Sequence, residues 1–193
     1  MRIAFTGSSS TGKTTLAREV MRIPEFEVLV GRFLTEDARA LLREMGHTSM
    51  DEMSREDLRS FQRRYYDQKS ENEKRFESFL VDRSFVDVAA YWLVRDAFDL
   101  EPKDRDALVL SCEAGARLYD LHFYFPIGSI PFISDGYRSE RIDFHERIDA
   151  AIRDLCIQWR ITLIPIASPN LKQRIEQVVR TAKKASLARL PPT

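Results

Sequence analysis

The chain has 193 residues, of which 31% are charged and 44% hydrophobic, and its 30 basic side chains balance 30 acidic ones. These proportions exclude a disordered or low-complexity chain and fit a single globular domain spanning residues 1–193. The longest apolar runs are far too short to cross a membrane and no signal-peptide pattern opens the chain, so we expect a cytoplasmic protein without a membrane partner.

Segments with strand and helix patterns alternate along the whole sequence. We expect strands at residues 1–6, 26–30, 78–82, 120–126 and 161–167. We expect helices at residues 13–23, 35–46, 54–76, 84–98, 104–118, 139–159 and 170–188. This alternation predicts a three-layer α/β fold, in which helices cover both faces of a parallel five-stranded sheet and ligands bind at the carboxyl ends of the strands.

The first predicted strand leads into the stretch GSSSTGKTT. Its spacing matches G-x-x-x-x-G-K-[ST], the P-loop pattern of nucleotide-binding proteins, and a predicted helix follows, as that pattern requires. A Ser/Gly-rich linker, the alternative, would not need these flanks. Backbone amides of such a loop hold the phosphates of ATP, the lysine reaches the β and γ phosphates, and the hydroxyl binds Mg²⁺. We therefore predict that ATP is bound by Gly7, Ser8, Ser9, Ser10, Thr11, Gly12, Lys13, Thr14 and Thr15, with Lys13 also catalytic and Thr14 a Mg²⁺ ligand.

Two charged residues lie near the start of the helix predicted at 35–46, for which Thr35 is the expected N-cap and Gly46 the expected C-cap. Glu36 and Arg39 are three residues apart, on one face of that helix. A carboxylate accepts hydrogen bonds from a ribose diol, and a guanidinium pairs with oxyanions, so both are predicted to bind the acceptor substrate. An ordinary ion pair within the helix is the alternative.

The strand predicted at 78–82 ends in the carboxylate of Asp82, and Arg83 follows directly. At the carboxyl edge of the sheet, Asp82 could hold Mg²⁺ or accept a proton from an attacking hydroxyl, and Arg83 could fix a phosphate or the acceptor. We predict catalytic roles for both and a metal-binding role for Asp82; a strand-end cap is its alternative. Asp87 and Tyr91, one turn apart on the next helix, are predicted to bind substrate, with packing as their alternative.

The stretch SDGYRSERIDFHER lies between the strand predicted at 120–126 and the next helix. Gly136 permits a turn, and Arg138 and Arg141 come close together where the helix begins. A flap at about 127–147 that carries these arginines would neutralise charge on the transferred phosphoryl group and exclude water. Both arginines are therefore predicted to be catalytic; surface ion pairs with neighbouring acidic residues are the alternative.

Several short motifs carry a family resemblance. The segment DRSFVDVAAY resembles the D-R-[GS]-x-x-D-x-x-A-Y segment of an AAA-labelled group of small P-loop kinases. That group includes the nicotinamide riboside kinase domain of bifunctional NAD-synthesis regulators and many phage proteins. TEDAR is similar to its E-x-x-R after strand two, and SDGYRSERIDFHERI to its D-G-x-R segment, while DRS also resembles the D/E-R-S triplet of deoxynucleoside kinases. The resemblance implies a kinase fold and leaves the acceptor open.

The predicted last helix, at about 170–188, is basic. The segment after Pro169 has a net charge of +5, and the rest of the chain therefore has −5. Its one acidic residue is Glu176, and its basic residues are Lys172, Arg174, Arg180, Lys183, Lys184 and Arg189. A packed helix with a solvated outer face explains this charge. Contact with a polyanion such as DNA is the alternative.

Together these residues predict a kinase that uses ATP and Mg²⁺ to place the γ phosphate on a hydroxyl of a nucleoside or nucleotide-like small molecule. One alternative is a kinase of a hydroxymethylated base in phage DNA, of the 5-hydroxymethyluracil type, which the basic tail would serve. Another is a P-loop switch ATPase or GTPase, although the N-K-x-D motif for guanine is absent from the sequence. The acceptor and the oligomeric state stay open.

Overall fold

A computed structural model describes residues 1–97, 99–131 and 141–189. Its strands form one parallel sheet with the order β2-β3-β1-β4-β5. They are β1 Arg2–Thr6, β2 Phe33–Leu34, β3 Phe79–Asp82, β4 Leu121–Tyr124 and β5 Leu163–Pro165. In this register Ile3 of β1 lies between Leu80 of β3 and Leu121 of β4. The predicted parallel five-stranded sheet is confirmed.

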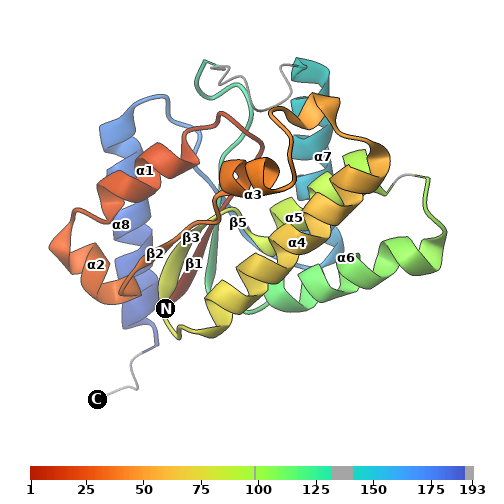
Figure 1. The fold of residues 1–193 in the computed structure, drawn as a ribbon. Helices are drawn as coiled ribbons and strands as arrows, with labels where there is room; N and C mark the ends of the chain where they lie inside the picture. Colours follow the sequence, from red (N-terminus) through yellow and green to blue (C-terminus); the bar gives the residue numbers. More distant parts are fainter. Residues whose placement is uncertain (98, 132–140, 190–193) are drawn as a thin grey trace.

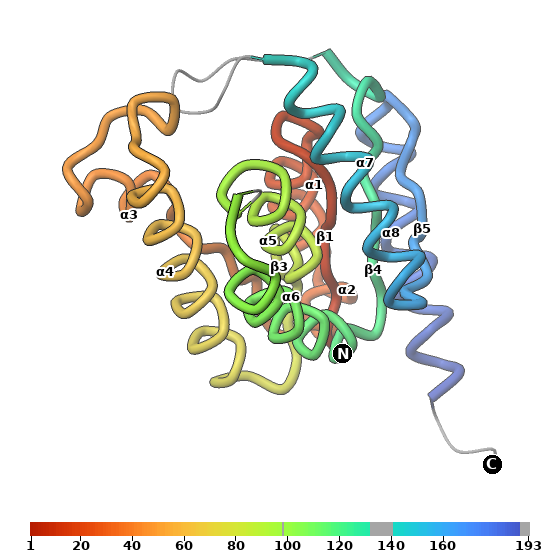
Figure 2. The backbone as a smooth tube through the Cα atoms, turned by 90° about the vertical axis from the view of Figure 1, so that its right-hand side faces the viewer, coloured from red at the N-terminus to blue at the C-terminus, as the bar shows by residue number. Residues whose placement is uncertain are grey.

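Helices cover both faces of the sheet (Figure 1). On one face lie α1 Lys13–Val20, α2 Pro24–Val30 and α8 Leu171–Leu187. On the other lie α3 Ala38–Glu44, α4 Arg55–Lys74, α5 Phe85–Tyr91, α6 Pro102–Ala116 and α7 Ile142–Gln158. A 3₁₀ turn, Met50–Glu52, precedes α4, and a π-helical turn, η2 Trp92–Asp96, continues α5. In Figure 2, turned by 90° from Figure 1, β3, β1, β4 and β5 follow one another across the view in the order of the sheet. The three-layer fold is confirmed.

The two cores follow the alternation of side chains along the central strand. Ile3 and Phe5 of β1 pack with α1, α2 and α8, whereas Ala4 points into the larger core below α4 to α7. All three residues are fully buried, as expected for a central parallel strand that is covered on both faces. The carboxyl end of β1 is therefore held rigidly where the loop at Gly7 begins.

The prediction of a strand at 26–30 is wrong, because these residues form helix α2 and the second strand is Phe33–Leu34. Pro24 occupies the first turn of α2 and Gly31 follows its last residue with a φ of 74°. Phe26 and Val30, four residues apart, are buried, while Val28 is 85% exposed. Burial at a spacing of four residues is helical, and an alternating strand would have buried Val28 as well.

The predicted start of the next helix is also wrong. The N-cap of α3 is Asp37, whose carboxylate accepts hydrogen bonds from the amides of Arg39 and Ala40, and not Thr35. Gly46 follows the C-cap residue, Met45, with a φ of 81°. Glu36 therefore lies in the connection before α3 and not on a helical face shared with Arg39.

The remaining elements overlap the predicted ranges: most are shorter, and α6 begins and ends two residues before the predicted 104–118. The Ser54 hydroxyl caps α4 by accepting from the amide of Asp57. Among the residues that the structure describes, no helix combines the length and the apolar composition needed to cross a membrane.

Candidate active site

The loop between β1 and α1 depends on two glycines. A Cβ on Gly7 would stand 2.6 Å from the carbonyl oxygen of Phe125, and Gly12 has a φ of 83° in the left-handed region. Neither position accepts a side chain without strain. In the described chain no side chain caps α1, and its first turn contains no acidic residue. The free amides and the positive end of the helix dipole therefore face the loop and favour an anion there.

Lys13 lies inside this loop with only 5% of its surface exposed. Its Nζ donates hydrogen bonds to the carbonyl oxygens of Gly7 at 2.7 Å and Ser8 at 2.6 Å and to the hydroxyl of Thr11 at 3.1 Å. Burial, followed by the nearby charge of Arg83, lowers the pKa of Lys13 to about 8, against the opposing effect of Asp82. This ammonium is held where phosphates would bind, and none of these three hydrogen-bond partners is a carboxylate.

Asp82 ends β3 directly beside α1. One of its carboxylate oxygens, Oδ2, accepts a hydrogen bond from the hydroxyl of Thr14. The other, Oδ1, is buried and has no hydrogen-bond partner within the described residues. A hydroxyl and a carboxylate oxygen side by side match the hard oxygen ligands that Mg²⁺ prefers. The described residues contain no group of three or more acidic, histidine or cysteine ligands, so these two would leave room for water and phosphate oxygens on Mg²⁺.

Arg83 reaches back from β3 to the phosphate loop. Its backbone has a φ of 75°, which is rare outside glycine, and its amide donates to the carbonyl oxygen of Phe5 at 2.9 Å. The guanidinium donates to the hydroxyl of Ser9 at 2.9 Å and lies 5.0 Å from the ring centroid of Tyr91. The Tyr91 hydroxyl lies 2.9 Å from the same Ser9 hydroxyl. Arg83 and Tyr91 therefore meet at the loop that would hold the phosphates.

Asp87 joins the phosphate loop to α5. Its Oδ1 accepts from the amide of Gly7 at 2.9 Å, and its Oδ2 accepts from both the amide and the hydroxyl of Ser84 at 2.8 Å. The side chain is completely buried. These contacts favour a supporting role in the loop, and direct contact of Asp87 with a substrate stays a prediction.

A cleft of about 1160 Å³ opens above the carboxyl ends of β1 and β3. Its walls bring together distant parts of the chain that the sequence singles out: residues 9–15, Glu36, Arg39, Asp82, Arg83, Asp87, Tyr91 and Arg141. Arg141 is exposed and donates to Asp143 at 2.7 Å, so the surface ion pair named as its alternative exists. Arg138 lies outside the described residues, and the catalytic roles of both arginines stay predictions. The volume suits a nucleotide together with a second small molecule.

A family model described as an AAA domain matches residues 2–174. This chain belongs to that AAA-domain family. The family agrees with the resemblance carried by the P-loop and the DRSFVDVAAY segment. No curated protein sequence matches this AAA-domain chain.

Solved structures similar to this AAA domain include three proteins of low sequence identity. Deoxyadenosine kinase from M. mycoides has 16% identity and a TM-score of 0.69 over 95% of this chain and 99% of that one. NadR in complex with NAD and AMP-PNP has 18% identity and a TM-score of 0.65 over 100% of this chain and 51% of that one, so this chain spans about half of NadR. Thymidylate kinase from Candida albicans has 13% identity and a TM-score of 0.63 over 100% of this chain and 95% of that one. They establish that the AAA domain has the fold of P-loop nucleoside and nucleotide kinases.

Two polar side chains of the AAA-domain cleft escape prediction from sequence. Gln62 of α4 donates to the carbonyl oxygen of Val88 at 2.9 Å and accepts from Arg95 of η2 at 3.3 Å. Both line the cleft beside the aromatic rings of Phe61 and Tyr65. For Gln62 the sequence offers one signal: Gln62, Lys69 and Glu73 are polar residues that share one face of α4 at helical spacing. Only the packing of α4 on α5 reveals that these residues face inward.

The basic helix α8 of the AAA domain uses part of its charge internally. Arg174, 3% exposed, donates from Nη1 to the carbonyl oxygen of Thr11 at 3.0 Å and so supports the phosphate loop. Lys183 pairs with Glu25, and Arg189, which lies beyond the end of α8, pairs with Asp120. The expected solvated basic face is therefore correct for only part of α8, since Arg174 points inward.

Replacing Asp87 by alanine should lower the free energy of unfolding by about 3 kcal/mol, because the buried amides of Gly7 and Ser84 lose their acceptors. Urea denaturation measures this loss. Asp57 is the matched control: it occupies the same third position of α4, bonds its own N-cap Ser54 at 2.6 Å, and lies at an exposed helix start. Asp57→Ala should cost less than about 1 kcal/mol. Equal costs in the two variants would contradict the supporting role of Asp87.

Proposed function

We propose that this AAA-domain protein is an ATP-dependent kinase that transfers the γ phosphate to a hydroxyl of a nucleoside or nucleotide-like acceptor. The observation that carries the proposal is one shared cleft, in which the phosphate loop and the strand-end Asp82 form one wall and Glu36 and Tyr65 form another. Donor and acceptor would meet there out of bulk water, as phosphoryl transfer requires.

The donor side follows from the phosphate loop. The amides at the start of α1 and the ammonium of Lys13 would hold the phosphates of ATP. Thr14 and Asp82 would hold Mg²⁺, which neutralises charge on the β and γ phosphates when bound. From α8, Arg174 donates a hydrogen bond to the carbonyl oxygen of Thr11 and would so hold this part of the loop in place. Arg83, already at Ser9, would stabilise charge on the transferred group.

The acceptor side lies between α3, α4 and α5. The Oε2 atom of Glu36 is buried without a hydrogen-bond partner in the described chain, so it can accept from an acceptor hydroxyl. Phe61 and Tyr65 offer flat apolar surfaces to a base. Arg39, at the exposed rim, would pair with an oxyanion of a nucleotide-like acceptor. The structural neighbours named deoxyadenosine kinase and thymidylate kinase support an acceptor of this size.

The test is transfer of label from ATP to a panel of nucleosides, nucleotides and duplex DNA with hydroxymethylated bases. We expect label on a small acceptor, with Lys13→Ala as the inactive control. Hydrolysis of ATP without labelling of any acceptor would overturn the proposal in favour of a switch ATPase. Labelling of the DNA alone, with affinity that falls steeply with salt and less steeply after removal of the residues beyond Arg180, would overturn it in favour of a DNA kinase.

A further inference from the structure

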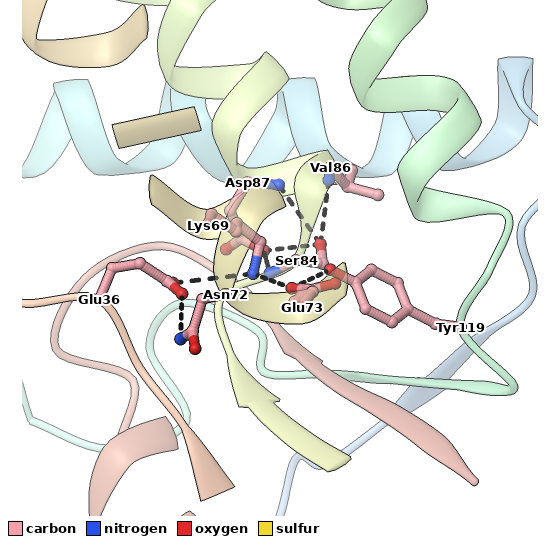
Figure 3. A network of polar contacts seen from close by, with 8 residues as sticks. All are labelled: Glu36, Lys69, Asn72, Glu73, Ser84, Val86, Asp87 and Tyr119. Atoms are coloured by element: carbon pink, nitrogen blue, oxygen red, sulfur yellow. Dashed lines mark hydrogen bonds and ion pairs between the residues drawn. The ribbon is translucent and has the colours of Figure 1, made fainter. Parts of the chain in front are cut away.

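The polar helix α4 buries an ammonium group in the larger core. Lys69 has no exposed surface, and its Nζ lies 2.5 Å from the Oε1 atom of Glu73 (Figure 3). The same Nζ lies 5.1 Å from the ring centroid of Phe85. Burying a charge is costly unless it is paired. A neutral apolar side chain of similar volume often fills such a position at equal or lower cost in folding free energy, so packing alone does not account for this ammonium.

The ion pair with Glu73, on the side of Lys69 away from the cleft, holds the ammonium of Lys69 in place. The Tyr119 hydroxyl donates to the same Oε1 atom of Glu73 at 2.8 Å (Figure 3). The Tyr119 ring stacks on Phe85 at 6.1 Å between centroids. Glu73 is itself 7% exposed. A carboxylate held from two sides gives the Lys69 ammonium a fixed anchor.

The inner end of the network reaches the cleft. The Lys69 ammonium lies 3.8 Å from the Oε2 atom of Glu36, and the Asn72 amide donates to Oε1 of Glu36 at 3.3 Å (Figure 3). The Glu36 side chain is 3% exposed, although the residue lies in a loop on the cleft wall. Two residues of α4 therefore hold a carboxylate that the loop before α3 alone would leave free to rotate.

The charges around this ammonium do not balance within the network. Glu36 and Glu73 bring two carboxylates to one ammonium, and Oε2 of Glu36 has no hydrogen bond within the described chain. An unsatisfied buried acceptor at a cleft wall favours a ligand that donates a hydrogen bond.

We propose that Lys69 is a positioning residue for the acceptor: it holds the carboxylate of Glu36 so that Oε2 accepts a hydrogen bond from a hydroxyl of a sugar-bearing acceptor. The inference rests on the proposed kinase function and names a residue that touches no substrate itself. Lys69 acts through Glu36, so its removal should affect the acceptor and spare ATP.

The test compares Lys69→Met, Glu36→Gln and the double variant in transfer to the best small acceptor. We expect Lys69→Met to raise the acceptor KM by about 10-fold or more, as loss of one charged hydrogen bond predicts, with the Kd of Mg·ATP within about threefold of wild type. In the Glu36→Gln background, Lys69→Met should add little, because the carboxylate on which it acts has gone. The proposal would be overturned if the effects of Lys69→Met and Glu36→Gln on the acceptor KM were additive in the double variant. It would also be overturned if Lys69→Met weakened Mg·ATP binding as much as it raised the acceptor KM, because Lys69 would then have only a structural role.

Two further variants guard against misfolding. Lys69→Met/Glu73→Gln removes the carboxylate that would otherwise be buried unpaired, and it should still show the raised KM. Tyr119→Phe removes one contact of Glu73 but keeps the ion pair between Glu73 and Lys69, so it should leave the KM unchanged. Ligand-free crystal structures supply a readout that needs no acceptor: Glu36 should leave its place in Lys69→Met and keep it in Tyr119→Phe. If wild type labels no acceptor, the proposed function fails on its own, and an unmoved Glu36 in Lys69→Met overturns the role of Lys69.

Discussion

Replacing Lys13 by alanine should reduce phosphoryl transfer by about 10³-fold or more while the fold persists, because no other described lysine lies in the phosphate loop. The ligand-free loop already holds this ammonium with the carbonyl oxygens of Gly7 and Ser8. The alanine variant has no cation at the place where negative charge gathers during transfer. Single-turnover transfer measures the loss, and thermal unfolding checks the fold.

The pKa of Lys13 adds a second signature to this prediction. Burial, with repulsion from Arg83, lowers that pKa to about 8, so the group is protonated below pH 8 and neutral above it. Only the protonated form attracts phosphate, and the affinity for Mg·ATP should therefore fall as the pH rises above about 8. In Lys13→Ala this fall should be absent, whereas Lys172→Ala, at an exposed lysine of α8, should keep the wild-type profile. Wild-type transfer by Lys13→Ala would refute the assignment of the phosphate loop.

What could be predicted from the sequence was determined locally. The spacing from Gly7 to Thr14 requires a strand before it and a helix after it, and both are found. Buried apolar runs such as residues 79–81 indicate central strands, because a parallel sheet covered on both faces has no polar side. The strand prediction at 26–30 is wrong because five mostly apolar residues fit a buried strand as well as a helix. Pro24 in the first turn is the local feature that favours the helix.

What could not be predicted depends on contacts between distant residues. Lys69 and Arg174 have the sequence signature of solvated helix faces, and only Glu73 in one case and the carbonyl of Thr11 in the other show why they are buried. Glu36, predicted to bind the acceptor, lines the cleft, but it lies before α3, and its partners come from α4 and not from the helix on which it was expected. Binding roles for the site residues stay predictions.

Replacing Asp82 by asparagine should lower transfer by about 10²-fold or more and raise the Mg²⁺ concentration needed for half-maximal rate. The physical reason is the position of the carboxylate, whose Oδ2 accepts from the Thr14 hydroxyl while Oδ1 stays buried without a partner in the described chain. Asparagine keeps the shape and the acceptor for Thr14, but it replaces one anionic oxygen by an amide that cannot bind a cation. The matched control is Asp149→Asn, a buried carboxylate that accepts from the Tyr124 hydroxyl at 2.8 Å and does not line the cleft.

Each role of Asp82 leaves a different result in this variant. If Asp82 serves only as the base for the acceptor hydroxyl, transfer falls while the Mg²⁺ requirement and the Kd of Mg·ATP stay within a few-fold of wild type. If it is a strand-end cap, transfer persists and the free energy of unfolding falls by about 1 kcal/mol. Parallel measurement of Mg·ATP binding, of transfer across a Mg²⁺ series and of urea denaturation separates these outcomes. We expect the metal-binding result because Thr14 and Asp82 already meet at the loop, and an unchanged Mg²⁺ requirement would assign Asp82 to the acceptor instead.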